Sequence, residues 1–131
     1  GSRFHELLEE RGVQFDGTCG SALKAIVLAV CSYLTRMQGP NGGRQLEPHM
    51  ESAIIAVVRR MLLDGLKRHP SENAIAAEMI AATASWAIYG AAKEWAQTPN
   101  RCASEEIADT VTMLVSPIVQ LPHEQPQHSA T

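Results

Sequence analysis

Apolar residues recur at intervals of three and four along most of the chain, which is the spacing of one face of an α-helix. A short stripe in residues 4–11 predicts a first helix, and a nearly uncharged stripe in residues 18–38 predicts a second, deeply buried one. The run of Gly, Pro and Asn at 39–43 then breaks the pattern. The second stripe consists of Leu23, Ile26, Val27, Val30, Cys31, Leu34 and Met37.

Three more helices are predicted, over residues 48–68, 71–97 and 104–121, with a possible additional break around 44–50. Pro48 suits the first turn of a helix, and Ser104 is expected to cap the last one. The stripes of the third and fifth helices are Ile54, Val57, Val58, Met61, Leu62 and Leu66, and Ile107, Val111, Leu114, Ile118 and Leu121. No strand pattern competes, so the sequence predicts an all-α fold of about five to six helices.

The fourth helix is unusual because it is apolar on two faces and small through its middle. One predicted face holds Ile75, Met79, Ala82, Trp86 and Tyr89; the opposite face holds Ala77, Ile80, Ala84, Ala87, Ile88, Ala91 and Trp95. A helix of this kind must be covered on two sides. One domain core covers one side, so the other needs a second layer of this chain or a partner chain.

Composition narrows the class of protein. A chain of 131 residues is expected to form one domain. The net charge of −3 with no basic stripe excludes a nucleic-acid surface on this chain, and no wholly apolar run is long enough to predict a membrane span. Three widely spaced cysteines, Cys19, Cys31 and Cys102, favour reduced thiols and a cytoplasmic protein.

Boundaries follow from the two ends of the sequence. Residues 1–2, Gly-Ser, are typical of the remnant of a cleaved expression tag, so we expect a longer natural N-terminus before residue 3. Residues 3–121 form the predicted helical domain. Residues 122–131 are rich in Pro, His, Gln, Ser and Thr and are expected to be disordered.

The sequence offers no catalytic constellation. It has no nucleophile elbow, phosphate-binding loop or dinucleotide fingerprint, and its histidines and carboxylates match no metal-ligand spacing. Cys31 has apolar neighbours along the chain, which favours a buried, unreactive thiol. We therefore expect no enzyme activity, no metal and no cofactor.

The last two predicted helices carry a family resemblance. The stretch AATASWAIYGAAKEW at 81–95, followed by a polar turn, SEEIA at 104–108 and MLVSPI at 113–118, resembles the penultimate and final helices of TetR-family (tetracycline-repressor) C-terminal domains. The order of the upstream elements is also similar. The family's N-terminal helix-turn-helix head is not found, so this fragment alone is not expected to bind DNA.

The resemblance implies a homodimer in which the last two helices of each subunit form a four-helix bundle. It also implies that a small hydrophobic effector binds among the preceding helices and controls binding of operator DNA by the missing head, with no membrane involved. The expected dimer residues are Ala84, Ala87, Ile88, Ala91, Trp95, Thr110, Met113 and Pro117. The expected ligand-binding residues are Leu34, Met37, Val58, Met61, Met79, Trp86 and Tyr89.

Alternatives remain open at each step. The small face of the fourth helix can instead pack within the chain, and stripes such as these are more often core than pocket. The main competing function is a helical protein-interaction or scaffold domain without a ligand. A helical-bundle enzyme would need a buried polar cluster that the sequence does not predict.

Overall fold

The computed structural model describes residues 20–38, 48–68 and 74–120, and the protein is all-α in these ranges. The helices are α2 (Gly20–Gln38), α3 (Pro48–Arg68), α4 (Ala74–Gln97) and α5 (Ser104–Gln120). The described part therefore holds four helices rather than the five to six expected. The expected helix at 4–11 and the tail at 122–131 lie outside the described residues, and residues 48–50 belong to α3.

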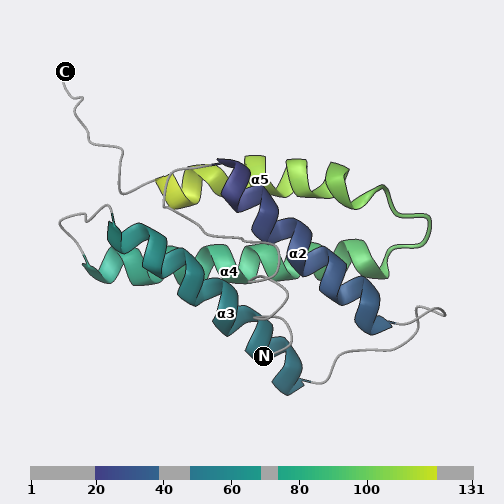
Figure 1. The fold of residues 1–131 in the computed structure, drawn as a ribbon, viewed down its shortest axis with the longest axis horizontal. Helices are drawn as coiled ribbons and strands as arrows, with labels where there is room; N and C mark the ends of the chain where they lie inside the picture. Colours follow the sequence, from purple (N-terminus) through teal and green to yellow (C-terminus); the bar gives the residue numbers. More distant parts are fainter. Residues whose placement is uncertain (1–19, 39–47, 69–73, 121–131) are drawn as a thin grey trace.

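The four helices form two layers (Figure 1). Helices α4 and α5 run antiparallel and contact each other, joined by a short turn at residues 98–103. Helix α2 crosses in front of this pair and packs against both members, and α3 lies across α4 on the same side. As a result, the opposite side of the α4–α5 pair has no helix of the described chain over it.

The core lies where α2 and α3 meet the α4–α5 pair. The α2 stripe is confirmed, because Ile26, Val27 and Val30 are completely buried and Met37 packs at the margin. In α3 the buried residues include Ile54, Val58, Leu62 and Leu66, also as expected. The facing side of α4 is mostly alanine, and small side chains let the helices approach closely.

Helix α2 is long and apolar enough, over Gly20–Met37, to pass a simple length-and-hydropathy test for a membrane span. The central helix of a globular core passes the same test. In this fold α2 packs against α4 and α5, and its Lys24 forms an ion pair with Asp109 of α5 at 2.9 Å. These contacts bury one side of α2 within the described fold.

The buried stripe of α5 is rotated relative to the expected one. Its buried residues are Ala108, Val111, Val115 and Val119, whereas Leu114 is 67% exposed. The helix also continues past Pro117 to Gln120. Proline does not end it because Pro117 is exposed on the outside, where water can reach the carbonyl group that has lost its helical partner.

The start of α5 differs from the expectation by one residue. The Ala103 carbonyl accepts hydrogen bonds from the amides of Glu106 and Ile107, at 3.0 and 3.3 Å, so Ala103 occupies the cap position. Ser104 is the first residue inside the helix. Its hydroxyl makes no hydrogen bond with the described chain and is left for other contacts.

Candidate functional site

The expected ligand-binding residues do not line a common cavity. Leu34 and Val58 lie in the closed core, and Met37 and Met61 are half-buried against it. The cavity that the structure describes contains none of the seven expected residues. These four residues therefore pack in or against the core, which agrees with the alternative that their stripes are core and not a ligand pocket.

Tyr89 is also buried, and its hydroxyl group is already engaged. It donates a hydrogen bond of 2.8 Å to Oε2 of Glu51, which also binds Nζ of Lys93 at 2.7 Å. The hydrogen bonds from Lys93 and then Tyr89 hold the pKa of Glu51 below its usual value. Burial, with the Glu51 carboxylate close by, raises the pKa of Tyr89 well above its ordinary range. The hydrogen bonds of Glu51 with Tyr89 and Lys93 therefore link α3 to α4.

Met79 and Trp86 correct the orientation predicted for α4. Both were expected to face inward, but their exposed fractions are 64% and 61%. Ala84 and Ile88, expected at a dimer interface, are completely buried within the chain. The α4 face expected at the dimer interface therefore packs in the core, together with Tyr89 from the face expected to point inward, whereas Met79 and Trp86 meet solvent.

The other expected dimer residues divide in the same way. Trp95 is buried, and Ala87 and Ala91 are half-buried against the core. Thr110, Met113 and Pro117 of α5 are exposed, as an interface residue of a free subunit must be. Only the α5 part of the expected interface therefore lies on the surface.

We define the outer face of α4–α5 as Met79, Trp86, Met113 and Leu114, together with the exposed Thr83, Thr110 and Pro117 and the half-buried Gly90 on the same two helices. The first four are the large hydrophobic residues that the described chain exposes. A Cβ atom added at Gly90 would meet nothing within 4 Å. Exposed apolar patches of this kind mark interaction sites more often than scattered single residues do.

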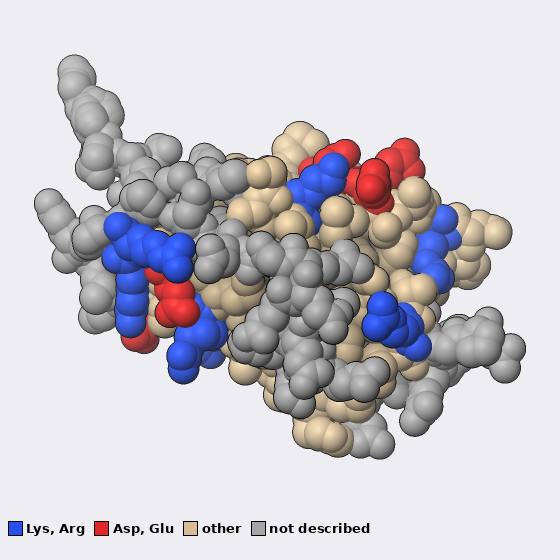
Figure 2. Space-filling view, viewed as in Figure 1, with Lys and Arg blue, Asp and Glu red and all other residues tan. Residues whose placement is uncertain are grey.

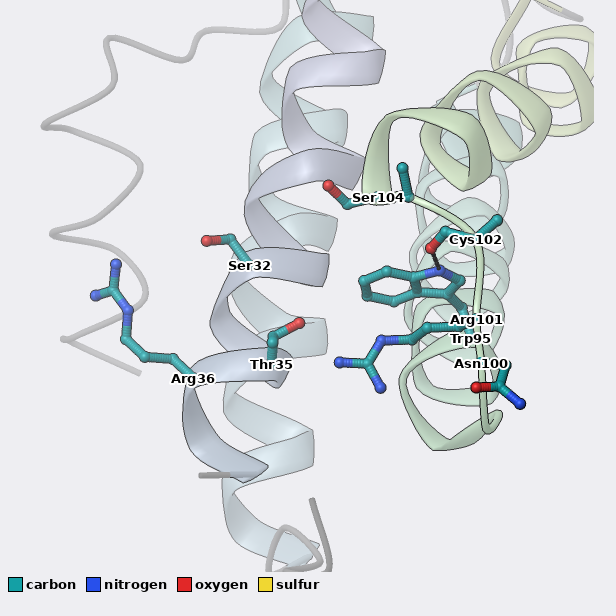
Figure 3. Close-up of a pocket in the computed structure, with 9 residues that line it drawn as sticks. Ser32, Thr35, Arg36, Trp95, Asn100, Arg101, Cys102 and Ser104 are labelled. Carbon is teal, nitrogen blue, oxygen red and sulfur yellow. Dashed lines mark hydrogen bonds between the residues drawn. The ribbon is translucent and has the colours of Figure 1, made fainter. Parts of the chain in front are cut away.

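A second feature is a cleft between the C-terminal half of α2 and the α4–α5 turn (Figure 3). Its volume is about 730 Å³, and it is shallow, with most of its extent open to solvent. It is lined by Ser32, Thr35, Arg36, Trp95, Asn100, Arg101, Cys102, Ala103 and Ser104. None of these residues was predicted as a ligand contact, and only Trp95 was among the residues expected at a dimer interface.

The turn that forms one wall of the cleft is held by several hydrogen bonds to the end of α4. Asn100 adopts a left-handed conformation with φ of 54°, which reverses the chain. Arg101 then folds back so that Nη1 binds the Ala96 carbonyl at 3.1 Å, with its guanidinium 4.9 Å from the centre of the Trp95 ring. Nε1 of Trp95 donates to the Cys102 carbonyl at 2.8 Å. Because these groups brace one another, the position of Arg101 is set by the fold.

The cleft carries positive charge on a chain whose net charge is −3. Arg36 and Arg101 contribute cations, no carboxylate lines the cleft, and neither arginine has an ion-pair partner among the described residues. Figure 2 shows basic side chains without acidic ones over the end of α2 and the turn, whereas acidic side chains cluster near the start of α5. The sequence analysis did not predict this site, because its two walls are far apart along the chain.

The cysteines show no sign of activation. Burial, helped by the nearby Cys102 thiol, raises the pKa of Cys31 to about 11, so this thiol is neutral at neutral pH. Cys102 is exposed on the turn, and Cys19 lies outside the described residues. Within the described ranges, no three side chains of His, Cys, Asp or Glu are grouped as a metal site requires.

No protein family, curated protein or solved structure matches this chain in comparisons of its sequence and fold. The fold and the two surface features therefore define the class of protein by themselves: an all-α protein with an exposed apolar helix pair and a basic cleft at one end of that pair.

Proposed function

We propose that this chain is the dimerisation and effector-sensing domain of a TetR-like transcription regulator, in which a separate head binds operator DNA. The observation that carries the proposal is the set of large apolar side chains that the helix pair leaves exposed, Met79 and Trp86 on α4 and Met113 and Leu114 on α5. Aromatic residues and methionine are enriched at protein interfaces, and a twofold interface needs a surface that complements itself.

The occupant that fits this face is a second copy of the same chain. Two antiparallel helices present an apolar outer side, and two such pairs facing each other form a four-helix bundle. A glycine inside a helix costs about 1 kcal/mol relative to alanine. In the described chain, nothing lies within 4 Å of a Cβ atom added at Gly90. A glycine at this position would allow a helix of the partner to approach α4 closely.

The dimerisation proposal also revises which residues form the interface. Trp86, Met79 and Leu114 replace the buried Ala84 and Ile88, while Met113, Thr110 and Pro117 are retained. The expected hydrophobic effector has less support, because the residues assigned to it lie in a closed core or on the outer face. Effector sensing is proposed instead for the cleft at the α4–α5 turn.

The competing function is a helical interaction domain that uses the same outer face for a different protein. The burial of Leu34 and Val58 in the core, with Met79 and Trp86 at the surface, favours this alternative. The two proposals differ in the state of the isolated chain, since only self-association produces a dimer without another protein.

Light scattering at micromolar concentration tests this difference. We expect a mass of twice 14.2 kDa for the unmodified chain. Trp86→Arg places a charge on the outer face and should weaken association by at least about 2 kcal/mol, or roughly thirtyfold, with helical circular dichroism unchanged.

The matched control is Ala56→Arg, which adds the same charge at an exposed position of α3. It should leave the dimer intact. A monomeric unmodified chain at the highest soluble concentration, or a Trp86→Arg variant that dimerises like the control, would overturn the proposed dimer and favour the interaction domain.

A further inference from the structure

We propose that the cleft between α2 and the α4–α5 turn binds a small, hydroxylated organic anion through a carboxylate or phosphate group. This inference deepens the sensing part of the proposed function and does not depend on dimerisation. The cleft's volume of about 730 Å³ falls within the range of small-molecule sites, roughly 300 to 1,000 Å³. Its lining specifies the chemistry of the ligand.

Arg101 is the primary anion contact. One of its donors is used on the Ala96 carbonyl, and its guanidinium lies over the Trp95 ring, which fixes its position before any ligand arrives. Figure 3 shows the guanidinium extending across the cleft toward α2. A guanidinium presents five N–H donors in a planar fork that matches the paired oxygens of a carboxylate or phosphate. A preplaced fork binds such a group with little further loss of side-chain entropy.

The remaining lining favours a polar ligand. Ser104 points toward α2, and its hydroxyl is not committed to another described group, while the Thr35 hydroxyl already donates to the Cys31 carbonyl and can accept. Trp95 is 9% exposed and offers little ring surface to an apolar compound. Hydroxyl groups of a ligand can therefore be matched here, whereas a purely apolar compound would leave these groups unpaired.

Arg36 supplies a second cation from the opposite wall. In Figure 3 its side chain extends away from Arg101, and it is exposed with no ion-pair partner among the described residues. Its long stem allows the guanidinium to turn toward a bound anion, which lowers the free energy of the complex further. We therefore expect Arg36 to add affinity and Arg101 to position the ligand.

The position of the cleft connects it to the outer face. A ligand held between Arg101 and α2 would bridge α2 to the turn that joins α4 and α5. Helix α4 also carries Trp86, and α5 carries Leu114. A ligand that binds one spacing of these helices better than another shifts the population toward that spacing. Such a shift is the physical link that a sensing domain requires.

Trp95 provides the test, because the chain contains only one other tryptophan. In a Trp86→Phe background all tryptophan fluorescence comes from the cleft. The probes are citrate and glucose 6-phosphate, with glucose and sodium chloride at matched ionic strength as neutral and salt controls. We expect a saturable fluorescence change with at least one of the two anions and none with glucose or salt; which anion binds separates a carboxylate site from a phosphate site.

Arg101→Met, which keeps the side-chain stem, should weaken binding roughly tenfold or more, since a charge-assisted hydrogen bond is lost. Arg36→Gln should weaken it by a smaller factor, and Arg59→Gln, an exposed arginine of α3, should leave it unchanged. Calorimetry on the unmodified chain repeats the titration without a fluorescent reporter, so a poorly folded Arg101 variant does not decide the outcome.

The absence of saturable binding by either anion in both measurements overturns the inference. So does an equal loss in Arg59→Gln and Arg101→Met, which would show attraction by overall charge. Light scattering on the same samples keeps the two proposals apart: binding by a monomer leaves the sensing site standing without the dimer, and a dimer without binding leaves dimerisation standing without this site.

Discussion

Trp86 and Trp95 lie in the same helix, α4, in opposite surroundings. Trp86 is 61% exposed. Trp95 is buried, donates its indole N–H to the Cys102 carbonyl and carries the Arg101 guanidinium on its ring. Trp95 is packed entirely by residues of its own chain. Trp86 would become buried only if another molecule covered it.

The difference separates the two apolar faces of α4: one contributes to folding of the subunit and the other, in the proposed dimer, to association. The face with Ala84 and Ile88 is buried by α2 and α3 and stabilises the subunit. The face with Met79 and Trp86 adds little to the stability of the subunit because it stays in water. Folding and association therefore draw on separate sides of α4, and substitutions can distinguish them.

The largest expected effect comes from exchanging a residue on each side. Ile88→Ala removes buried methyl and methylene groups and should lower the free energy of unfolding by about 2 to 5 kcal/mol. Met79→Ala, on the exposed side, should change it by no more than about 0.5 kcal/mol. Urea unfolding in the Trp86→Arg background measures both without a contribution from self-association. Comparable losses at the two positions would show that both faces are buried.

The sequence predicted the fold class and most helix limits because those signals are local. Pro48 begins α3 and a stretch near Ser104 begins α5, as capping chemistry indicates. In α2 the periodic stripe and its lack of charge correctly identified the buried residues. Each of these predictions depends only on neighbours within a few turns of the same helix.

The orientation of α4 could not be predicted in this way. Between Met79 and Gly90 it has no charged residue to mark the side facing water, so the wheel offered two apolar faces and no means of choosing. Large residues were assigned to the inside and alanines to an interface. The structure instead buries Ala84, Ile88 and Trp95 against the other helices and leaves Met79 and Trp86 exposed.

The cleft was missed for a different reason. The stretch 98–101 was correctly expected to be a turn, but no local pattern indicates that Arg101 will fold back onto Trp95 or that α2 will lie opposite. An arginine that follows a helix with a tryptophan in its last turn is the one signal available. It becomes informative only when the packing of α2 is known.

Replacing Glu51 of α3, which accepts hydrogen bonds from Tyr89 and Lys93 of α4, should have a medium effect on the free energy of unfolding. The pKa of Glu51 is lowered in the folded chain, so its contribution to stability is present above its usual pKa of about 4.5 and is lost as pH falls through the lowered value. At neutral pH, Glu51→Gln should cost about 1 kcal/mol.

Urea unfolding between neutral pH and the acid range checks this prediction. The difference between the unmodified chain and Glu51→Gln should shrink as the pH falls below the usual pKa of glutamate. Glu78→Gln, at an exposed position of α4, should show no such convergence. If the difference in free energy of unfolding between the unmodified chain and Glu51→Gln did not depend on pH, packing and not the charge of Glu51 would stabilise the contact between α3 and α4.

The smallest expected effect is also the most specific, because folding and association should respond with opposite signs. Gly90 lies inside α4, and a Cβ added there meets nothing within 4 Å. Gly90→Ala should therefore stabilise the subunit by up to about 1 kcal/mol through helix propensity. If a partner helix approaches this position, the same methyl group should weaken the dimer, as measured by light scattering over a dilution series.

Thr83→Ala separates close approach from a general change on the same face. It also raises helix propensity at an exposed position of α4, but it removes atoms where Gly90→Ala adds them. We expect Thr83→Ala to stabilise the subunit without the loss of association that Gly90→Ala causes. A dimer that tolerates Gly90→Ala as well as it tolerates Thr83→Ala would place the contact between subunits elsewhere on the outer face, toward Trp86 and Leu114, and would leave Gly90 without a role in this fold.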